Sequence, residues 1–407
     1  MSVVALATLA AVSFGYQLGG TPLGPVDVLD DGAGPIVIAR WNPTPALVAL
    51  RLSVPIDEET SPPGAARILQ ELARKPLEAE ARRIGARIEF SATPAHAVYM
   101  VSGPASVFGA LVALLERAIG PPTLSMRSLE SARVAVQWEA AAALETPGGL
   151  VRRRLQKAMF PFLPAPSGAP TALAPLRPAD LDAFWRRNYR PERMTLVAVG
   201  PVRGDRVASA VAEWRGPERA RPAPERAPYI DVAPADGPEP QVVSSWVGLG
   251  YPLEGEDPVV VAVAAHLIDD RLATQGLRSA AAELWWDAGR LGIAVIGAAL
   301  PGPPVEGDGD IARSLADRLG ALVRGMAHSA TAASVRRARD DLELRILLGA
   351  RTPTGLASLI GELADRAGDP EAAPDFVTAL ARLDESEVLA LLDRLSYQAP
   401  ILVEVAP

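Results

Sequence analysis

The feature that most constrains the fold is a proline-rich segment in the middle of the chain. Between Arg215 and Pro240 the sequence contains seven prolines and many charges without hydrophobic periodicity, which is typical of a linker. On both sides of this segment, strand-like apolar runs and helical segments follow one another in the same order. We therefore predict an α+β fold of two homologous halves, each a mixed or antiparallel β-sheet covered by helices.

The length of 407 residues is enough for two or three domains with large cores, because 49% of the residues are hydrophobic. We expect four segments, which are an N-terminal apolar segment (1–24), a first domain (25–215), the linker (216–240) and a second domain (241–407). The run from Ser2 to Gly15 has the length of the apolar core of a signal peptide and is too short to cross a bilayer. It lacks the usual preceding Lys or Arg, so it is a candidate signal peptide or an apolar segment packed on the fold. We expect a periplasmic or otherwise exported protein, with a cytoplasmic protein as the alternative.

Local patterns predict most of the elements. In the first half, strands are expected at 36–41, 47–54, 87–92, 97–102 and 194–199. Helices are expected there at 62–84, 106–119, 128–144, 149–159 and 178–189, with one more ending near 214. In the second half, we expect strands at 241–248, 291–299 and 401–405, a helix at 258–270, and three or four helices between 311 and 395. The alanine-rich stretch 278–285 has the composition of an amphipathic helix, and Trp285 and Trp286 are alternatively the start of a core strand.

The residue census excludes several kinds of chemistry. The chain has no cysteine and only three histidines, His96, His266 and His328, which lie far apart in the sequence. A thiolate metal site and a cysteine nucleophile are therefore excluded, and the histidines are interpreted as unrelated structural or surface residues. The net charge of -8 argues against nucleic acid or an anionic membrane as the main partner. We expect no cofactor, no nucleic-acid partner and no integral membrane span.

Several phrases spread over nearly the whole length carry a family resemblance. The stretch from Asp27 to Ala39 looks like an "L-x-N-G-L" turn and strand, and Ile84 to Ala92, followed by Tyr99, is similar to "lGg-x-x-N-A-x-T". The stretch from Asn188 to Gly200 matches "Y-x-P-x-N-m-x-l-v-v-v-G", and Ala65 to Leu72 occupies the slot of a zinc-binding helix. In these phrases the chain resembles the insulinase, pitrilysin and mitochondrial processing peptidase family, specifically its shorter bacterial two-subunit branch.

The resemblance implies a zinc site that this chain does not retain. In the family motif H-x-x-E-H, two histidines bind zinc and the glutamate accepts a proton from the metal-bound water. The corresponding residues here are Arg67, Gln70 and Glu71. Arginine cannot act as a ligand, and Gln70 is the non-basic isostere of the glutamate. The family's third ligand matches Glu139, which is alternatively an ordinary acid on a helix surface, so we predict no zinc at this motif.

In the family, the second half or a partner subunit also supplies an arginine and, seven residues later, a tyrosine. These two residues polarise the scissile carbonyl. Arg278 and Trp285 have that spacing here, with an indole in place of the phenol. The resemblance therefore predicts a catalytically inactive subunit that pairs with an active zinc-bearing chain, encloses a peptide substrate with it, and contributes Arg278 to the partner's site. The alternative is a structural or peptide-binding module derived from the same fold.

Overall fold

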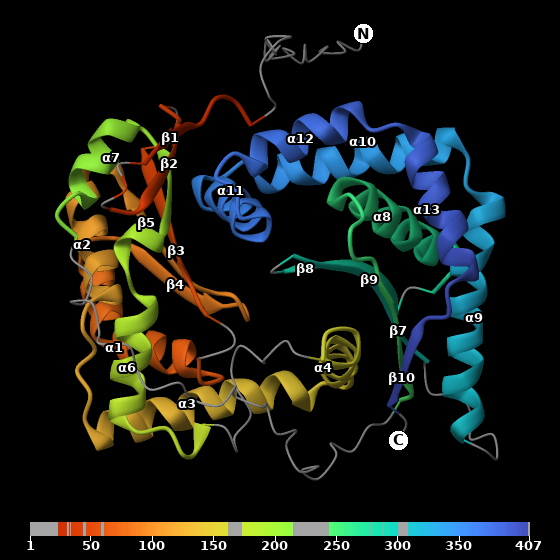
Figure 1. Cartoon of the computed structure of the whole chain (residues 1–407), viewed down its shortest axis with the longest axis horizontal. Helices are drawn as coiled ribbons and strands as arrows, with labels where there is room; N and C mark the ends of the chain where they lie inside the picture. The colour runs from red at the N-terminus through yellow and green to blue at the C-terminus, as the bar shows by residue number, and fades with distance from the viewer. Residues whose placement is uncertain are drawn as a thin grey trace, which may run out of the picture.

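The computed structural model describes residues 23–30, 32, 34–43, 46–57, 61–161, 173–214, 244–277, 279–287, 289–299 and 308–405. These residues form two α+β halves, each built around its own sheet (Figure 1). The predicted fold class is confirmed. The linker 216–240 and nearly all of the apolar segment 1–24 lie outside the described residues.

The first sheet has six strands in the order β1-β2-β6-β3-β5-β4, and only the β2–β6 pair is parallel. Their bounds are β1 Asp27–Leu29, β2 Ile36–Trp41, β3 Leu47–Pro55, β4 Arg87–Ala92, β5 His96–Pro104 and β6 Thr195–Gly200. Its core contacts involve the helices α1 Ala65–Arg83, α2 Phe108–Ile119, α6 Pro178–Asn188 and α7 Gly204–Val211. Alternate residues of β3, including Leu50 and Leu52, point into this core, because side chains of a strand alternate between its faces.

The second sheet has four antiparallel strands in the order β10-β7-β9-β8. Their bounds are β7 Trp246–Pro252, β8 Ala280–Asp287, β9 Arg290–Ala298 and β10 Ile401–Val405. The helices of this half are α8 Pro258–Thr274, α9 Asp308–Ser329, α10 Ala332–Gly349, α11 Pro353–Ala367, α12 Ala372–Arg382 and α13 Glu385–Tyr397. The main core of this half lies between the sheet and α8, α9 and α13.

Most predicted elements are present, and three predictions need correction. The stretch expected as an alanine-rich helix is strand β8, because every residue from Ala280 to Asp287 pairs with β9 and this pairing overrides the helix propensity of alanine. The first strand of the second half is β7, Trp246–Pro252, which is shifted from the predicted 241–248. Five helices lie between 308 and 397. Thr331 and Thr352 cap α10 and α11, so each of these threonines marks the start of a separate helix.

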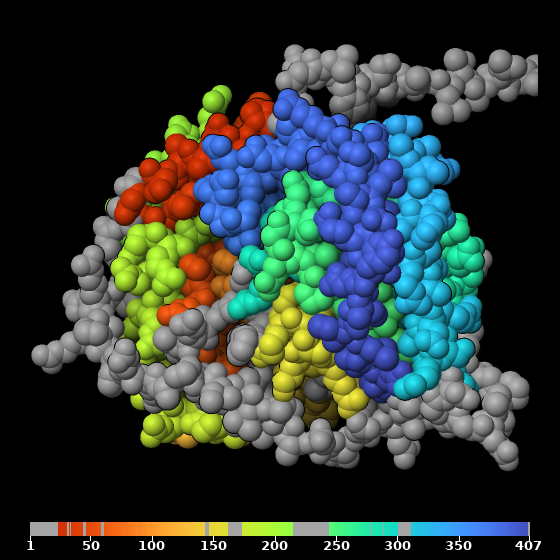
Figure 2. Space-filling model, turned by 45° about the vertical axis from the view of Figure 1, so that its right-hand side comes forward, coloured from red at the N-terminus to blue at the C-terminus, as the bar shows by residue number. Residues whose placement is uncertain are grey.

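The two halves exchange one helix each. Helix α4 (Pro147–Met159), which follows α3 (Met126–Glu145), packs on the second sheet, and α11 packs on the first sheet (Figure 1). In the space-filling view, the yellow segment that contains α4 and the blue segment that contains α11 lie against elements of the other half (Figure 2). Neither sheet is therefore covered on both faces by its own half alone.

Glycines on the second sheet make room for α4. A Cβ atom at Gly250 would lie 2.6 Å from Met159, and one at Gly248 would lie 2.8 Å from Val151. A third glycine, Gly292, faces the same methionine at 2.6 Å. The alternation of glycine with large apolar residues along β7 thus produces a flat face for a helix on one side and a packed core on the other.

A buried polar contact fixes α11 against the first sheet. Arg51 donates hydrogen bonds to Asp365 at 2.7 Å and to Ser53 at 2.7 Å, and Ser53 donates to the same carboxylate at 2.9 Å. The side chains of Arg51 and Asp365 are 4% and 9% exposed. The guanidinium lies over Gly361, where a Cβ would be 2.2 Å from Arg51 Nη1. This ion pair therefore sets the position of α11 along β3.

Candidate functional site

The residues of the degenerate motif lie in the first two turns of α1, beside α3 and the β4–β5 hairpin. Arg67 donates through Nη1 to Gln70 Oε1 at 2.7 Å and to the carbonyl oxygen of Phe90 at 3.1 Å. Its Nη2 forms an ion pair with Glu139 of α3. The structure therefore brings Arg67, Gln70 and Glu139 together, and the guanidinium connects the other two side chains.

Gln70 connects the helix to both strands of the hairpin. Its Nε2 donates to the carbonyl oxygens of Ser91 at 2.7 Å and Val98 at 3.1 Å, and these two residues face each other in the β4–β5 ladder. The residue is 1% exposed. An amide suits this position because it donates to two carbonyls and accepts from Arg67, whereas an ionised carboxylate could only accept.

Glu71 takes part in a separate contact. Arg74 donates to its two carboxylate oxygens at 2.8 and 3.0 Å, and Lys75 lies 3.9 Å away. The hydrogen bond to Glu71 raises the pKa of Arg74, against the opposing effect of burial. Both oxygens of Glu71 thus already have a guanidinium partner within its own helix.

These donors do not fit a zinc ion. A closed or catalytic zinc site needs at least three lone-pair donors at about 2.0 to 2.3 Å, usually nitrogen or sulfur. Arg67 has none, the oxygen of Gln70 accepts from Arg67, and Glu139 is paired with the same guanidinium. The guanidinium of Arg67 supplies the positive charge at this place. These residues therefore provide no site for metal-assisted hydrolysis.

An aromatic group beneath the motif was missed by residue-level reasoning. The hydroxyls of Tyr99 on β5 and Tyr189 after α6 lie 2.6 Å apart, and Phe90 packs edge-on against Tyr99 with ring centroids 4.9 Å apart. Burial raises the pKa of both tyrosines, so they stay neutral and share a hydrogen bond. Both tyrosines belong to the family phrases, but the sequence does not show that they contact each other. Their pairing joins positions 90 residues apart.

A cleft of about 530 Å³ lies between the halves. One wall is the end of β4 and the start of β5, including Phe90, Ser91 and His96, and the opposite wall is formed by α11 and the end of β8. Among the described strands, β4 and β8 are edges of their sheets. Unpaired backbone groups at such edges can bind an extended peptide.

Of Arg278 and Trp285, the two residues predicted to act at a partner's site, only Trp285 belongs to the described residues. Arg278 lies outside the described residues. Trp285 lies in β8, where its Nε1 donates to Glu283 at 3.3 Å, and it packs beside the α4 contact. Glu283 also pairs with Arg152 of α4, so this indole belongs to the contact between the halves. Its neighbour Trp286 is the one that lines the cleft.

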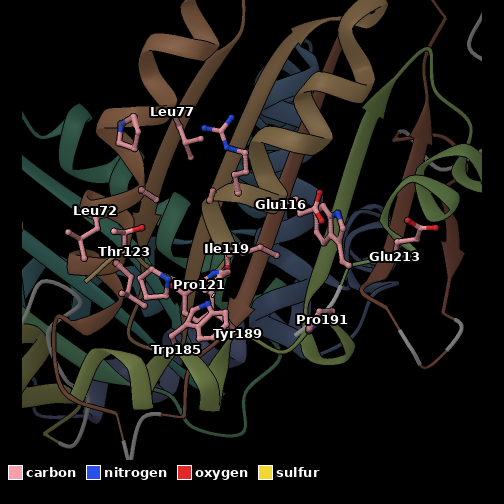
Figure 3. Close-up of a pocket in the computed structure, with 18 residues that line it drawn as sticks. Leu72, Leu77, Glu116, Ile119, Pro121, Thr123, Trp185, Tyr189, Pro191 and Glu213 are labelled. Atoms are coloured by element: carbon pink, nitrogen blue, oxygen red, sulfur yellow. Dashed lines mark hydrogen bonds between the residues drawn. The ribbon is translucent and has the colours of Figure 1, made fainter. Parts of the chain in front are cut away.

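A second cavity, of about 540 Å³, lies beside the later turns of α1 and the end of α2 (Figure 3). Its lining is rich in apolar and aromatic side chains, among them Leu77, Ile119 and Trp185. The Trp185 indole donates to the carbonyl of Ile119 at 2.8 Å, so its polar atom is already bonded within the protein. This cavity shares helix α1 with the degenerate motif but not Arg67, Gln70 or Glu139.

Comparisons with known proteins identify the fold. No family profile matches the sequence, and no curated protein is significantly similar to it. A protease from Helicobacter pylori aligns with a TM-score of 0.79 at 15% identity, covering 94% of this chain and 100% of that one. A putative M16-like peptidase from Alicyclobacillus acidocaldarius aligns at 0.73 with 17% identity, covering 94% and 98% of the two chains.

A third structure, the peptidase M16 inactive domain from Pseudomonas fluorescens, aligns at 0.74 with 14% identity, covering 93% of this chain and 97% of that one. These likenesses show that the chain has the fold of M16-like peptidases over nearly its full length. They agree with the sequence resemblance. Among the described helices, none is long and apolar enough to cross a membrane.

Proposed function

We propose that this chain is a non-catalytic subunit of a heteromeric zinc peptidase, which pairs with an active chain and helps to enclose its peptide substrate. The observation that carries this proposal is the guanidinium of Arg67, which bonds to Gln70 and Glu139, the positions where the resemblance places the general base and the third zinc ligand. A fold kept over two halves without its metal ligands suits a chain whose partner supplies the chemistry. One of the structures with this fold is itself described as an inactive domain.

The cleft between the halves favours a second function, which is peptide binding without any catalytic partner. The edge strands β4 and β8 reach this cleft, and its lining combines aromatic side chains with charged ones such as Arg366 and Glu362. An extended peptide could pair with either edge through main-chain hydrogen bonds. The two functions differ in whether an active chain is needed for any measurable effect on the peptide.

The deciding experiment is co-expression with a neighbouring gene product that has an intact H-x-x-E-H motif. The proposal expects a stable complex in size-exclusion chromatography with light scattering, and peptide cleavage that exceeds the activity of the partner alone. Cleavage by this chain alone, abolished by Glu139→Gln, would reject the proposal. Peptide binding to the isolated chain without any complex formation would favour the second function.

The proposed contribution of Arg278 rests on the sequence and is tested in the same complex. Loss of one donor to the developing oxyanion lowers turnover about a hundred- to a thousand-fold. Arg278→Ala should therefore reduce turnover by that factor without changing assembly, while Arg271→Ala, on the exposed face of α8, serves as the matched control. Full turnover of the complex with Arg278→Ala removes this role and leaves the pairing itself untouched.

A further inference from the structure

Three side chains that can bind a metal converge between α8 and α10, away from the degenerate motif. His266 and Asp270 lie one turn apart on α8, and Asp341 lies on α10. Their donor atoms, which are an imidazole nitrogen and two carboxylate oxygens, all lie within 4.8 Å of one another. The sequence alone does not show the partner of His266, because Asp341 is 75 residues away in the chain.

The imidazole is held in a fixed orientation. The side chain of His266 is only 6% exposed, and its Nε2 lies 2.8 Å from Asp341 Oδ2. Within the described part of the chain, the side chain of Asp270 makes no hydrogen bond or ion pair, and the residue is exposed. A buried nitrogen, a half-exposed carboxylate and an exposed carboxylate thus point toward one place from two packed helices.

The geometry points to a binding site for a divalent transition-metal ion that joins α8 to α10 through His266, Asp270 and Asp341. Two ligands of a tetrahedral ion with bonds of about 2.1 Å are roughly 3.4 Å apart. Here the His266 and Asp341 donor atoms lie 2.8 Å apart, and all three donor atoms lie within 4.8 Å of one another, so small side-chain shifts reach that geometry. The ion replaces the hydrogen bond between His266 and Asp341. His266 then binds as the neutral tautomer with its proton on Nδ1, and water completes the coordination.

The donor set selects the metal. An imidazole with two carboxylates suits Zn²⁺, Co²⁺ or Ni²⁺, whereas Mg²⁺ and Ca²⁺ prefer oxygen ligands alone. Arg345 donates to Asp341 Oδ2 at 3.1 Å. Among the described residues, it is the one arginine or lysine that contacts this carboxylate and so competes with a metal ion for it. A ligating carboxylate has a second oxygen, so Arg345 can stay bonded to Asp341 while the metal binds, as a supporting contact.

The test is titration of the full chain, without a histidine tag and freed of metal by chelator, with Co²⁺ and then Zn²⁺. Calorimetry and the visible Co²⁺ spectrum should show one equivalent bound, with no binding of Mg²⁺. Asp270→Asn should weaken the affinity at least tenfold without touching the bond between His266 and Asp341. Asp340→Asn, which removes a neighbouring exposed carboxylate, is the matched control and should change the affinity less than twofold.

A second readout is thermal stability, because a metal bound only to the folded state raises the melting temperature. Zn²⁺ should raise the melting temperature of the natural chain and of Asp340→Asn by several degrees, and that of Asp270→Asn much less. Equal Co²⁺ affinity in the natural chain and Asp270→Asn overturns the inference, as does the absence of stoichiometric binding. Binding that is lost in Glu139→Gln and kept in Asp270→Asn overturns it as well, and places the metal at the α1 motif, against the proposed function.

Discussion

Gln70→Glu is the most informative single change in this chain, because it alters one atom and returns the motif residue that the peptidase resemblance expects. In the structure, Nε2 of Gln70 donates to the carbonyls of Ser91 and Val98 at 2.7 and 3.1 Å. The introduced carboxylate cannot donate, so the carbonyls of Ser91 and Val98 each lose one hydrogen bond, at a cost of about 1 to 1.5 kcal/mol each. The hydrogen bond from Arg67 becomes an ion pair, which offsets about 1 kcal/mol. The expected net loss is about 1 to 2 kcal/mol.

Urea unfolding followed by tryptophan fluorescence measures this loss, and hydrogen exchange locates it. Because a chain with two halves need not unfold in one step, the sharper readout is amide protection in β4, which should fall in Gln70→Glu. Gln275→Glu is the control, since that exposed residue after α8 undergoes the same chemical change without buried partners. A Gln70→Glu variant with stability within 0.5 kcal/mol of the natural chain and unchanged protection of β4 would refute the reasoning.

Three further predictions concern the contacts between the halves and one buried tyrosine. Asp365→Ala leaves the buried guanidinium of Arg51 without its counter-charge and should cost about 3 to 5 kcal/mol in urea unfolding, whereas Arg51→Met combined with Asp365→Leu should cost much less. Gly250→Ala places a Cβ 2.6 Å from Met159 and should cost about 1 to 3 kcal/mol; combined with Met159→Ala it should cost less than the sum of the two single changes, and simple additivity would count against the packing described. Burial raises the pKa of Tyr251 from 10.0 to about 12, so the folded state keeps a proton that the unfolded state releases. Its contribution to stability is complete below pH 10 and is lost as the pH rises from about 10 to 12. Circular dichroism during alkaline titration should therefore show a smaller pH dependence in Tyr251→Phe, and an identical dependence contradicts this assignment.

Sequence patterns predicted the elements that depend on local signals. The helix after Pro62 and Pro63, the strands rich in β-branched residues and the final strand 401–405 all follow from periodicity and turn residues, and they agree with the structure. The helical reading of the alanine-rich stretch 278–285 was wrong from Ala280 onward, because the state of these residues is decided by pairing with β9 and not by their composition; Trp285 and Trp286, alternatively expected in a strand, do lie in one.

The candidate site was predictable only in part. The loss of a metal ligand at Arg67 and of the general base at Gln70 can be read directly from the sequence, but their replacement bonds cannot. Arg67 meets Glu139 across 72 residues, and Arg51 meets Asp365 across 314 residues. Such contacts depend on how α3 and α11 pack, which neither hydrophobic periodicity nor capping residues specify. The glycines of β7 were visible as a pattern, but the identity of the helix that covers them was not.

The exchange of α4 and α11 between the halves has a consequence for how the chain arose and how it can be divided. A single ancestral half with this topology would leave one sheet face bare and could cover it only with the equivalent helix of a second copy, as in a domain-swapped homodimer. Gene fusion would then turn an interface between two molecules into the interior of one. A chain cut within 216–240 should accordingly yield two fragments that are each incomplete when expressed alone but reassemble when expressed together, since each fragment carries the missing layer of the other.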